Sequence, residues 1–144
     1  MANYLIIGAG KGIGLKTAGL LASDHSVLTV SRSATAELEA LGTTFLQADV
    51  TQPLPADLPG FPDVLHGIVY CPGSINLKPF TRLTSDDFLA DFRQSVIGAV
   101  QVIQRFLPHL RKAEGASVVL FSTVAVATGM PFHASVASAK GAVE

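Results

Sequence analysis

A glycine-rich segment near the N-terminus has the residue types and spacing needed to bind a dinucleotide. An apolar run at residues 4–7 leads into it, and a helical pattern begins within it. Glycine permits positive φ angles and a close approach of backbone to phosphate, and unpaired N–H groups at a helix start attract the anion. An ordinary turn and the cofactor loop of a methyltransferase are the alternatives. The residues expected to hold the pyrophosphate are Gly8, Gly10, Lys11, Gly12, Ile13 and Gly14.

The end of the second apolar run, residues 26–30, indicates which dinucleotide is bound. The residues that follow it are Ser31, Arg32 and Ser33, with no carboxylate among them. An acidic residue there would accept hydrogen bonds from the ribose 2′-hydroxyl of NAD(H), whereas a guanidinium group and hydroxyls suit the 2′-phosphate of NADP(H). The sequence therefore favours NADP(H) over NAD(H). The alternative for Arg32 is a solvated turn residue.

Asp49 and Cys71 come at the ends of the third and fourth apolar runs. Open α/β folds bind ligands at the carboxyl ends of their strands. A structural role in a turn is the alternative for Asp49. Cys71 is expected to be a small buried residue lining the site, because neither a CxxC partner nor an adjacent base would activate its thiol.

Lys140 is the charged residue in the C-terminal part of the chain that most needs a partner. It lies in an otherwise apolar helical pattern, so its ammonium group requires an anionic or hydroxyl partner, or a route to solvent. A surface lysine that reaches solvent is the alternative. The histidines His25, His66 and His109 lie apart, without the spacing of metal ligands, so no metal site is expected.

The elements that must position these residues alternate between strand-like and helix-like patterns, which is typical of βαβ units and a parallel sheet. Between the third and fourth strands, prolines at positions 53, 55, 59 and 62 predict a loop or a single turn rather than a helix. We expect strands at 4–7, 26–30, 44–47, 67–71 and 117–122, and helices at 13–23, 35–41, 85–110 and from about 133 to the end of the chain.

The helix expected at 85–110 has more apolar residues than one buried face requires. Thr84 and the acidic residues that follow it provide a cap and a favourable first turn. A helix that is apolar on nearly all sides is buried, so its second face is expected to meet another subunit. A homodimer or homotetramer formed through helix 85–110 is therefore predicted.

Composition limits the class of protein. The 144 residues suffice for a single domain, and 49% are hydrophobic but only 15% charged. The net charge of −1 and the lack of a basic run argue against a nucleic-acid partner. The single cysteine suits a reducing compartment, and neither a signal peptide nor an apolar run of the ~20 residues needed to span a membrane is seen. We expect a soluble cytoplasmic α/β domain.

Taken together, these features resemble the short-chain dehydrogenase/reductase family over the whole chain. The glycine loop is similar to the family's GxxxGxG loop, and Asp49 with Val50 matches the acidic–aliphatic pair that touches adenine in the family. Residues 70–73 stand where the family usually has Asn-Asn-Ala-Gly, so Cys71, Pro72 and Gly73 are implied to contact the cofactor. The resemblance implies a Rossmann-type, doubly wound α/β sheet with strand order 3-2-1-4-5, without the last strands of the family fold. Family members are longer, so residues 1–144 are expected to be one domain of a longer protein.

The active-site positions match the family only in part. The segment 134–140 resembles the one that carries the Tyr-x-x-x-Lys pair, but Val136 occupies the tyrosine position. Lys140 is kept and is implied to hydrogen-bond the nicotinamide ribose. The spacing of the family's active-site serine selects Thr123, with Ser122 beside it, to orient the carbonyl.

His133 is a candidate replacement for the missing tyrosine. It precedes Val136 by three residues and Lys140 by seven, so all three share a face if the helix already includes His133. Imidazole has a suitable pKa range for a proton donor. The alternative is an exposed histidine just ahead of the helix.

The predicted function is that of an NADP(H)-dependent oxidoreductase acting on a small-molecule carbonyl or alcohol, with an atypical active site. The alternative, supported by Val136, is a catalytically silent NADP(H)-binding protein that acts as a sensor or assembly partner.

Overall fold

The computed structural model describes residues 1–55 and 60–144, so Pro59 of the expected crossover lies outside the described residues. The strands are β1 (Asn3–Ile7), β2 (Ser26–Ser31), β3 (Thr44–Gln47), β4 (Gly67–Tyr70) and β5 (Ser117–Leu120). The helices are α1 (Gly12–Ala22), α2 (Ala36–Glu39), α3 (Ser85–Phe92), α4 (Gly98–Leu110), α5 (Ala125–Thr128) and α6 (Ala134–Gly141), with a 3₁₀ turn at Phe80–Arg82 and a π-helical segment at Arg93–Ile97.

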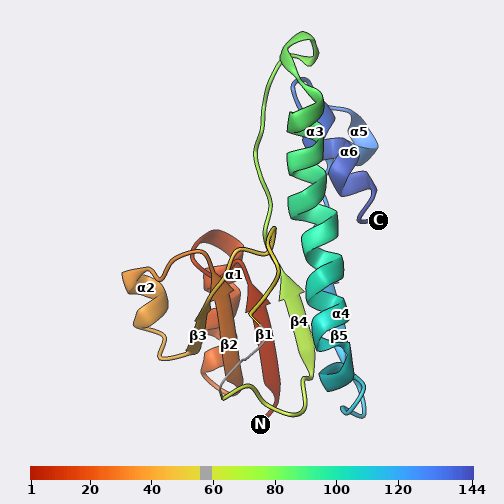
Figure 1. Ribbon diagram of the computed structural model, residues 1–144. Coiled ribbons are helices and arrows are strands. Elements are labelled where there is room, and N and C mark those ends of the chain that lie inside the picture. The colour runs from red at the N-terminus through yellow and green to blue at the C-terminus, as the bar shows by residue number, and fades with distance from the viewer. Residues whose placement is uncertain (56–59) are drawn as a thin grey trace.

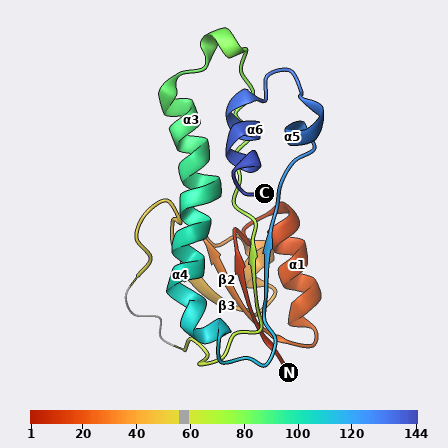
Figure 2. The same ribbon diagram turned by 90° about the vertical axis from the view of Figure 1, so that its right-hand side faces the viewer.

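The strands form one parallel sheet in the order β3-β2-β1-β4-β5, which confirms the predicted topology (Figure 1). Strand β1 lies at its centre, where Leu5 is paired with Leu28 of β2 and with Ile68 of β4. Helix α1 and the long helix that contains α4 lie on opposite faces of this sheet (Figure 2). The order reverses beside β1, which is where doubly wound sheets form a ligand-binding crevice.

Alternate side chains of the central strand enter two separate cores, as the period of a β-strand requires. Leu5 and Ile7 pack in the core that contains Val102 and Phe106 of α4. Ile6 packs in the core that contains Ala18 of α1. Because the middle of β1 is buried on both faces, its residues 4–7 form a continuous apolar run.

The described part of the crossover between β3 and β4, residues 48–55 and 60–66, contains no helix, as the prolines predicted. Two features of the C-terminal part differ from expectation. Helix α6 ends at Gly141 instead of continuing to Glu144, and the amide of Val143 bonds the carbonyl of Lys140 in a tighter turn. The single-turn helix α5 was not predicted, because four residues are too few to show a period.

The helix predicted at 85–110 is one continuous rod, but the π-helical segment Arg93–Ile97 separates α3 from α4 (Figure 1). Its start is confirmed, because Thr84 caps α3 in a capping box with Asp87. Its end at Leu110 agrees with the prediction as well. The π-helical turn within it was not predicted, because a single wide turn has no sequence period of its own.

Strand β5 forms one edge of the sheet. The exposed fractions of Val118, Val119 and Leu120 are 40%, 43% and 36%, so both faces of this strand are open among the described residues. Within that part of the chain no helix is both long and apolar enough to cross a bilayer.

Candidate functional site

A cavity of about 580 Å³ lies at the carboxyl ends of the central strands. This volume falls within the range of roughly 300–1,000 Å³ that is usual for ligand pockets. Every predicted cofactor residue except Lys140 lines the cavity: Gly8, Gly10, Lys11, Gly12, Ile13, Gly14, Ser31, Arg32, Ser33, Asp49, Val50, Cys71, Pro72 and Gly73. Residues from four segments that are distant in sequence thus line one cavity.

The glycine loop has a shape that larger residues would not adopt. Gly8 and Gly12 have φ angles of +79° and +58°, in the region that favours glycine. The amides of Gly8 and Ala9 both donate to the carbonyl of Val30, which fixes the loop to β2. A Cβ atom on Gly14 would lie closer than 3.0 Å to the carbonyl oxygen of Gly8, so α1 touches the turn that precedes it.

No side chain in residues 1–55 and 60–144 caps the start of helix α1. Its N-cap residue, Lys11, makes no side-chain capping hydrogen bond, and no acidic residue lies in the first turn. By contrast, Thr35 caps α2 and Thr84 caps α3. The N–H groups at the start of α1 therefore adjoin the cavity without a side-chain acceptor among the described residues, an arrangement that suits a bound anion.

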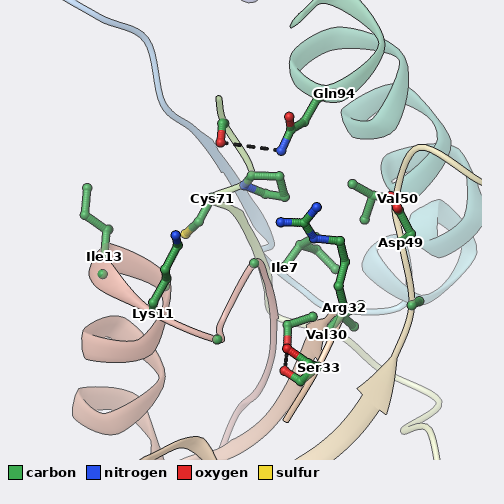
Figure 3. A pocket seen from close by; sticks show the side chains of 18 of the residues that line it. Ile7, Lys11, Ile13, Val30, Arg32, Ser33, Asp49, Val50, Cys71 and Gln94 are labelled. Atoms are coloured by element: carbon green, nitrogen blue, oxygen red, sulfur yellow. Dashed lines mark hydrogen bonds between the residues drawn. The ribbon is translucent and has the colours of Figure 1, made fainter. Parts of the chain in front are cut away.

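The tip of β2 presents a cation to the same cavity. The Ser31 hydroxyl donates to the carbonyl of Ser33 over 2.6 Å, and the Gln47 amide donates to the carbonyl of Arg32 over 2.9 Å. These bonds hold the turn through its backbone and leave the Arg32 guanidinium group to extend toward the middle of the cavity (Figure 3). Arg32 is exposed, as expected of a solvated turn residue, but its side chain also lines the cavity.

Asp49 forms a local turn, the alternative considered for it, and also lines the cavity. Its carboxylate accepts hydrogen bonds from the amide of Thr51 at 2.9 Å and from the hydroxyl of Thr51 at 2.7 Å, which forms a local turn. These bonds, with the charge of Arg32 as a smaller contribution, lower the pKa of Asp49 below its usual value. Asp49 also lines the cavity, so the turn holds an ionised carboxylate at its wall.

Lys140 is buried, with an exposed fraction of 9%, so the alternative of a surface lysine was wrong. Its Nζ donates to the carbonyl of Phe121 over 2.8 Å, and burial lowers the pKa of its ammonium group, opposed by Cys71. Although Lys140 does not line the cavity, a Cβ atom on Gly73, which does, would lie 3.7 Å from Nζ. The ammonium group thus lies directly behind the cavity wall.

Cys71 is half-buried in that wall, and burial raises the pKa of its thiol to about 11. Lys140 opposes this rise without overcoming it. The thiol is therefore neutral at ordinary pH and poorly suited to nucleophilic chemistry.

The other predicted active-site residues do not line the cavity. The Thr123 hydroxyl accepts a hydrogen bond from the amide of Ala125, and the Ser122 hydroxyl donates to Glu144. His133 is the N-cap of α6 rather than part of it, and its Nδ1 lies 2.7 Å from the carbonyl of Pro131. The condition for a shared face with Val136 and Lys140 is therefore not met.

Several lining residues were not predicted: Ile7, Val30, Thr35, Ala48, Thr51 and Gln94. Thr35 donates to the carbonyl of Gly10 over 3.2 Å while it caps α2, and its position before an acidic helical segment could have signalled this role. Nothing in the sequence indicated that Gln94 faces the cavity, because the π-helical segment changes the direction of its side chain.

No three His, Cys, Asp or Glu side chains in residues 1–55 and 60–144 are placed to share a metal ion.

Comparison with known proteins identifies the group to which this architecture is related. The family model for short chain dehydrogenases matches residues 2–144. An uncharacterized oxidoreductase of Schizosaccharomyces pombe is 30% identical over 152 residues, which cover 96% of this chain and 60% of the relative. The hydroxynaphthalene reductase arp2 of Aspergillus fumigatus is 28% identical over 158 residues, which cover 97% and 56%. The chain thus spans about three-fifths of the length of these relatives.

Solved structures show the same fold. A short-chain type dehydrogenase/reductase from Mycobacterium ulcerans superposes with a TM-score of 0.80 at 26% identity, over 99% of this chain and 58% of that one. A short chain dehydrogenase from Salmonella enterica serovar Typhi gives a TM-score of 0.86 at 18% identity, over 99% and 66% of the two chains.

Proposed function

This chain belongs to the short-chain dehydrogenase family, and from that premise we propose that it binds NADP(H) and acts as an oxidoreductase on a carbonyl or alcohol. The observation that carries the proposal is the uncapped start of α1, which adjoins the same cavity as the Arg32 side chain. The first would hold a pyrophosphate and the second a 2′-phosphate. When bound, the nicotinamide would supply the hydride.

Lys140 would act at the part of the cavity wall that Gly73 forms. Its ammonium group lies behind Gly73, within reach of a hydroxyl placed against that residue. We propose that it holds the nicotinamide ribose, as the family resemblance implies. Thr123, with Ser122 beside it, would orient the carbonyl once the capping bond to Ala125 is released.

The proposed reaction needs a proton for the alkoxide that forms from the carbonyl. Val136 has no proton to give, and His133 is turned toward the Pro131 carbonyl. We propose that water protonates the developing alkoxide, which predicts a slow enzyme, because a positioned general acid typically contributes about 10²–10⁴-fold to the rate.

A catalytically silent NADP(H)-binding protein is the second candidate, and Val136 is the observation that favours it. Oxidation of NADPH by the full-length protein against a panel of small aldehydes and ketones distinguishes the two. Turnover of any member supports the enzyme, whereas tight NADPH binding without oxidation supports the silent protein.

We expect Arg32→Ala to weaken NADPH binding by the full-length protein by roughly 10- to 100-fold, the loss of one charge-assisted contact. NADH, which lacks the 2′-phosphate, should bind with nearly unchanged affinity. Isothermal calorimetry with both cofactors measures this, and Arg111→Ala, an exposed arginine at the end of α4, is the matched control.

Equal weakening for NADPH and NADH would show that Arg32 does not read the 2′-phosphate. If neither cofactor binds the wild-type protein, the proposed function itself fails.

We also propose that the long helix joins subunits. The exposed fractions of Leu89, Phe92, Ile97 and Val100 are 59%, 40%, 40% and 43%, although α4 already buries Val102 and Phe106 against the sheet. We expect the full-length protein to be a dimer or tetramer by light scattering, and Leu89→Glu with Val100→Glu to shift it toward monomer. An unchanged mass for that double variant would place the interface elsewhere.

A further inference from the structure

The segment that follows β4 leaves the sheet at the cavity. The amide of Cys71 still bonds the carbonyl of Ile7, and the next backbone hydrogen bond runs from the amide of Lys78 to the carbonyl of Phe132. Between these points, no backbone–backbone hydrogen bond in the described part of the chain holds residues 72–77. The position of this segment at the cavity wall is therefore set by its side-chain contacts.

Asp87 of α3 holds the far end of the segment, which runs beside this helix (Figure 1). Its Oδ1 atom accepts from Nδ2 of Asn76 over 2.9 Å and from Nζ of Lys78 over 2.6 Å, and its Oδ2 atom accepts from the amide of Thr84. The bond from Lys78 is the largest of the contributions that hold the pKa of Asp87 well below its usual value. The carboxylate thus stays ionised at ordinary pH and binds both side chains.

Asp91 and Gln94 hold the near end of the segment, at the cavity. They follow Asp87 by four and seven residues, so all three lie on one side of the long helix. The Ser74 hydroxyl donates to Oδ1 of Asp91. Nε2 of Gln94 donates to the carbonyl oxygen of Gly73 over 3.4 Å (Figure 3). Two consecutive residues of the segment are thus bound by side chains that lie within one turn of the helix.

Gly73 lies between these contacts and Lys140. It lines the cavity, and a Cβ atom on it would lie 3.7 Å from Nζ of Lys140. The carbonyl of Gly73 is bound by Gln94, and the next residue is bound by Asp91. The distance between this part of the wall and the Lys140 ammonium group therefore depends on the two side chains of the helix.

Asp91 lowers the stability of the fold, which indicates that it has another purpose. Its exposed fraction is 2%, its Oδ2 atom has no hydrogen-bond partner, and within residues 1–55 and 60–144 it forms no ion pair. Burying a carboxylate without full compensation is unfavourable. An apolar residue of similar volume in place of buried charged groups is often neutral or stabilising. The one partner that Asp91 does have is Ser74, at the cavity wall.

We propose that Asp91 and Gln94 are positioning residues, which hold the cavity wall in front of Lys140 in the shape that the nicotinamide half of the cofactor needs. Asp91 acts through Ser74, and Gln94 acts on the carbonyl of Gly73. This inference rests on the proposed function, in which Lys140 holds the nicotinamide ribose. The adenosine half, with its 2′-phosphate at Arg32, does not depend on these contacts.

The test compares NADPH with adenosine 2′,5′-bisphosphate, which carries the 2′-phosphate but no nicotinamide, by calorimetry on the full-length protein. Ser74→Ala and Asp91→Val should each weaken NADPH binding by about tenfold, the loss of one hydrogen bond to a charged group, and leave binding of the bisphosphate unchanged. The two changes together should weaken it no more than either alone, because they remove the same bond. Gln94→Met, which keeps the length of the side chain but not the donor, should show the same selective loss.

Thermal unfolding separates positioning from a structural role. Asp91→Val removes a buried carboxylate, so this variant should unfold at the same temperature as wild type or higher, although it binds NADPH more weakly. Ser74→Thr retains the hydroxyl and should bind NADPH like wild type. Two controls, Ser138→Ala and Gln104→Ala, change exposed side chains of α6 and α4 and should alter neither affinity.

Each part of the proposal can be overturned separately. An unchanged NADPH affinity in Ser74→Ala and Asp91→Val overturns the role of Asp91, and an unchanged affinity in Gln94→Met overturns the role of Gln94. Equal weakening of both ligands overturns the inference as well, because the whole site would then have loosened. If wild type binds neither ligand, the proposed function has failed first, and this inference fails with it.

Discussion

Val136→Tyr is expected to raise the carbonyl reductase activity of the full-length protein by about 10²–10⁴-fold, the usual contribution of a positioned general acid. Residue 136 lies one helical turn before Lys140 on α6, so the two side chains share a face. A phenol at this position would have the Lys140 ammonium group beside it, which lowers a phenol pKa and favours proton transfer. The initial rate of NADPH oxidation with a reactive aldehyde measures the gain.

Val136→Phe is the control that isolates the hydroxyl group. Val136 has an exposed fraction of 7%, so either ring must displace neighbouring side chains, at a cost of about 1–3 kcal/mol in folding free energy. Only the tyrosine adds a proton donor. Equal rates for the two variants would refute the argument, and no gain with either would support the silent NADP(H)-binding protein.

Gly14→Ala is expected to cause the largest loss. The added methyl group would lie closer than 3.0 Å to the carbonyl oxygen of Gly8, and 3.1 Å from the Cα atom of Ala9. These are backbone atoms of the phosphate loop, so relief requires α1 to move away from it. We expect a loss of about 1–3 kcal/mol in stability and of at least about tenfold in NADPH affinity, measured by thermal unfolding and calorimetry.

Gly19→Ala, in the same helix, is the matched control. Its methyl group would meet only the Leu41 side chain, at 3.4 Å. Removing a glycine from a helix interior stabilises the helix by about 0.5–1 kcal/mol, so this variant should unfold at the same temperature or higher. If Gly14→Ala behaved like Gly19→Ala, the close contact between α1 and the loop would not be needed for binding.

The sequence was informative where structure follows from neighbouring residues. The glycine loop is a local feature. Its place between a strand and a helix predicted a turn that needs glycine, and Gly8 and Gly12 do have positive φ angles. The parallel sheet followed from the alternation of apolar runs, and its strand order from the family resemblance. Both were confirmed.

Features that depend on contacts between distant residues could not be predicted. The burial of Lys140 requires the carbonyl of Phe121 beside it, nineteen positions away in the chain. Gln94 lines the cavity from the π-helical segment, and no period in the sequence shows such a turn. The sequence left open whether His133 lies in the final helix or just ahead of it, and the structure makes it the N-cap of α6, as the alternative had it.

The exposed edge strand β5 has a consequence for purification of the protein. Its outer backbone groups are available to another strand, and Val118 and Val119 present apolar surface on opposite sides. Exposed edge strands of this kind pair with strands of other molecules and so promote aggregation. A polypeptide limited to these residues is therefore expected to aggregate during purification unless a further segment or a fused partner covers β5.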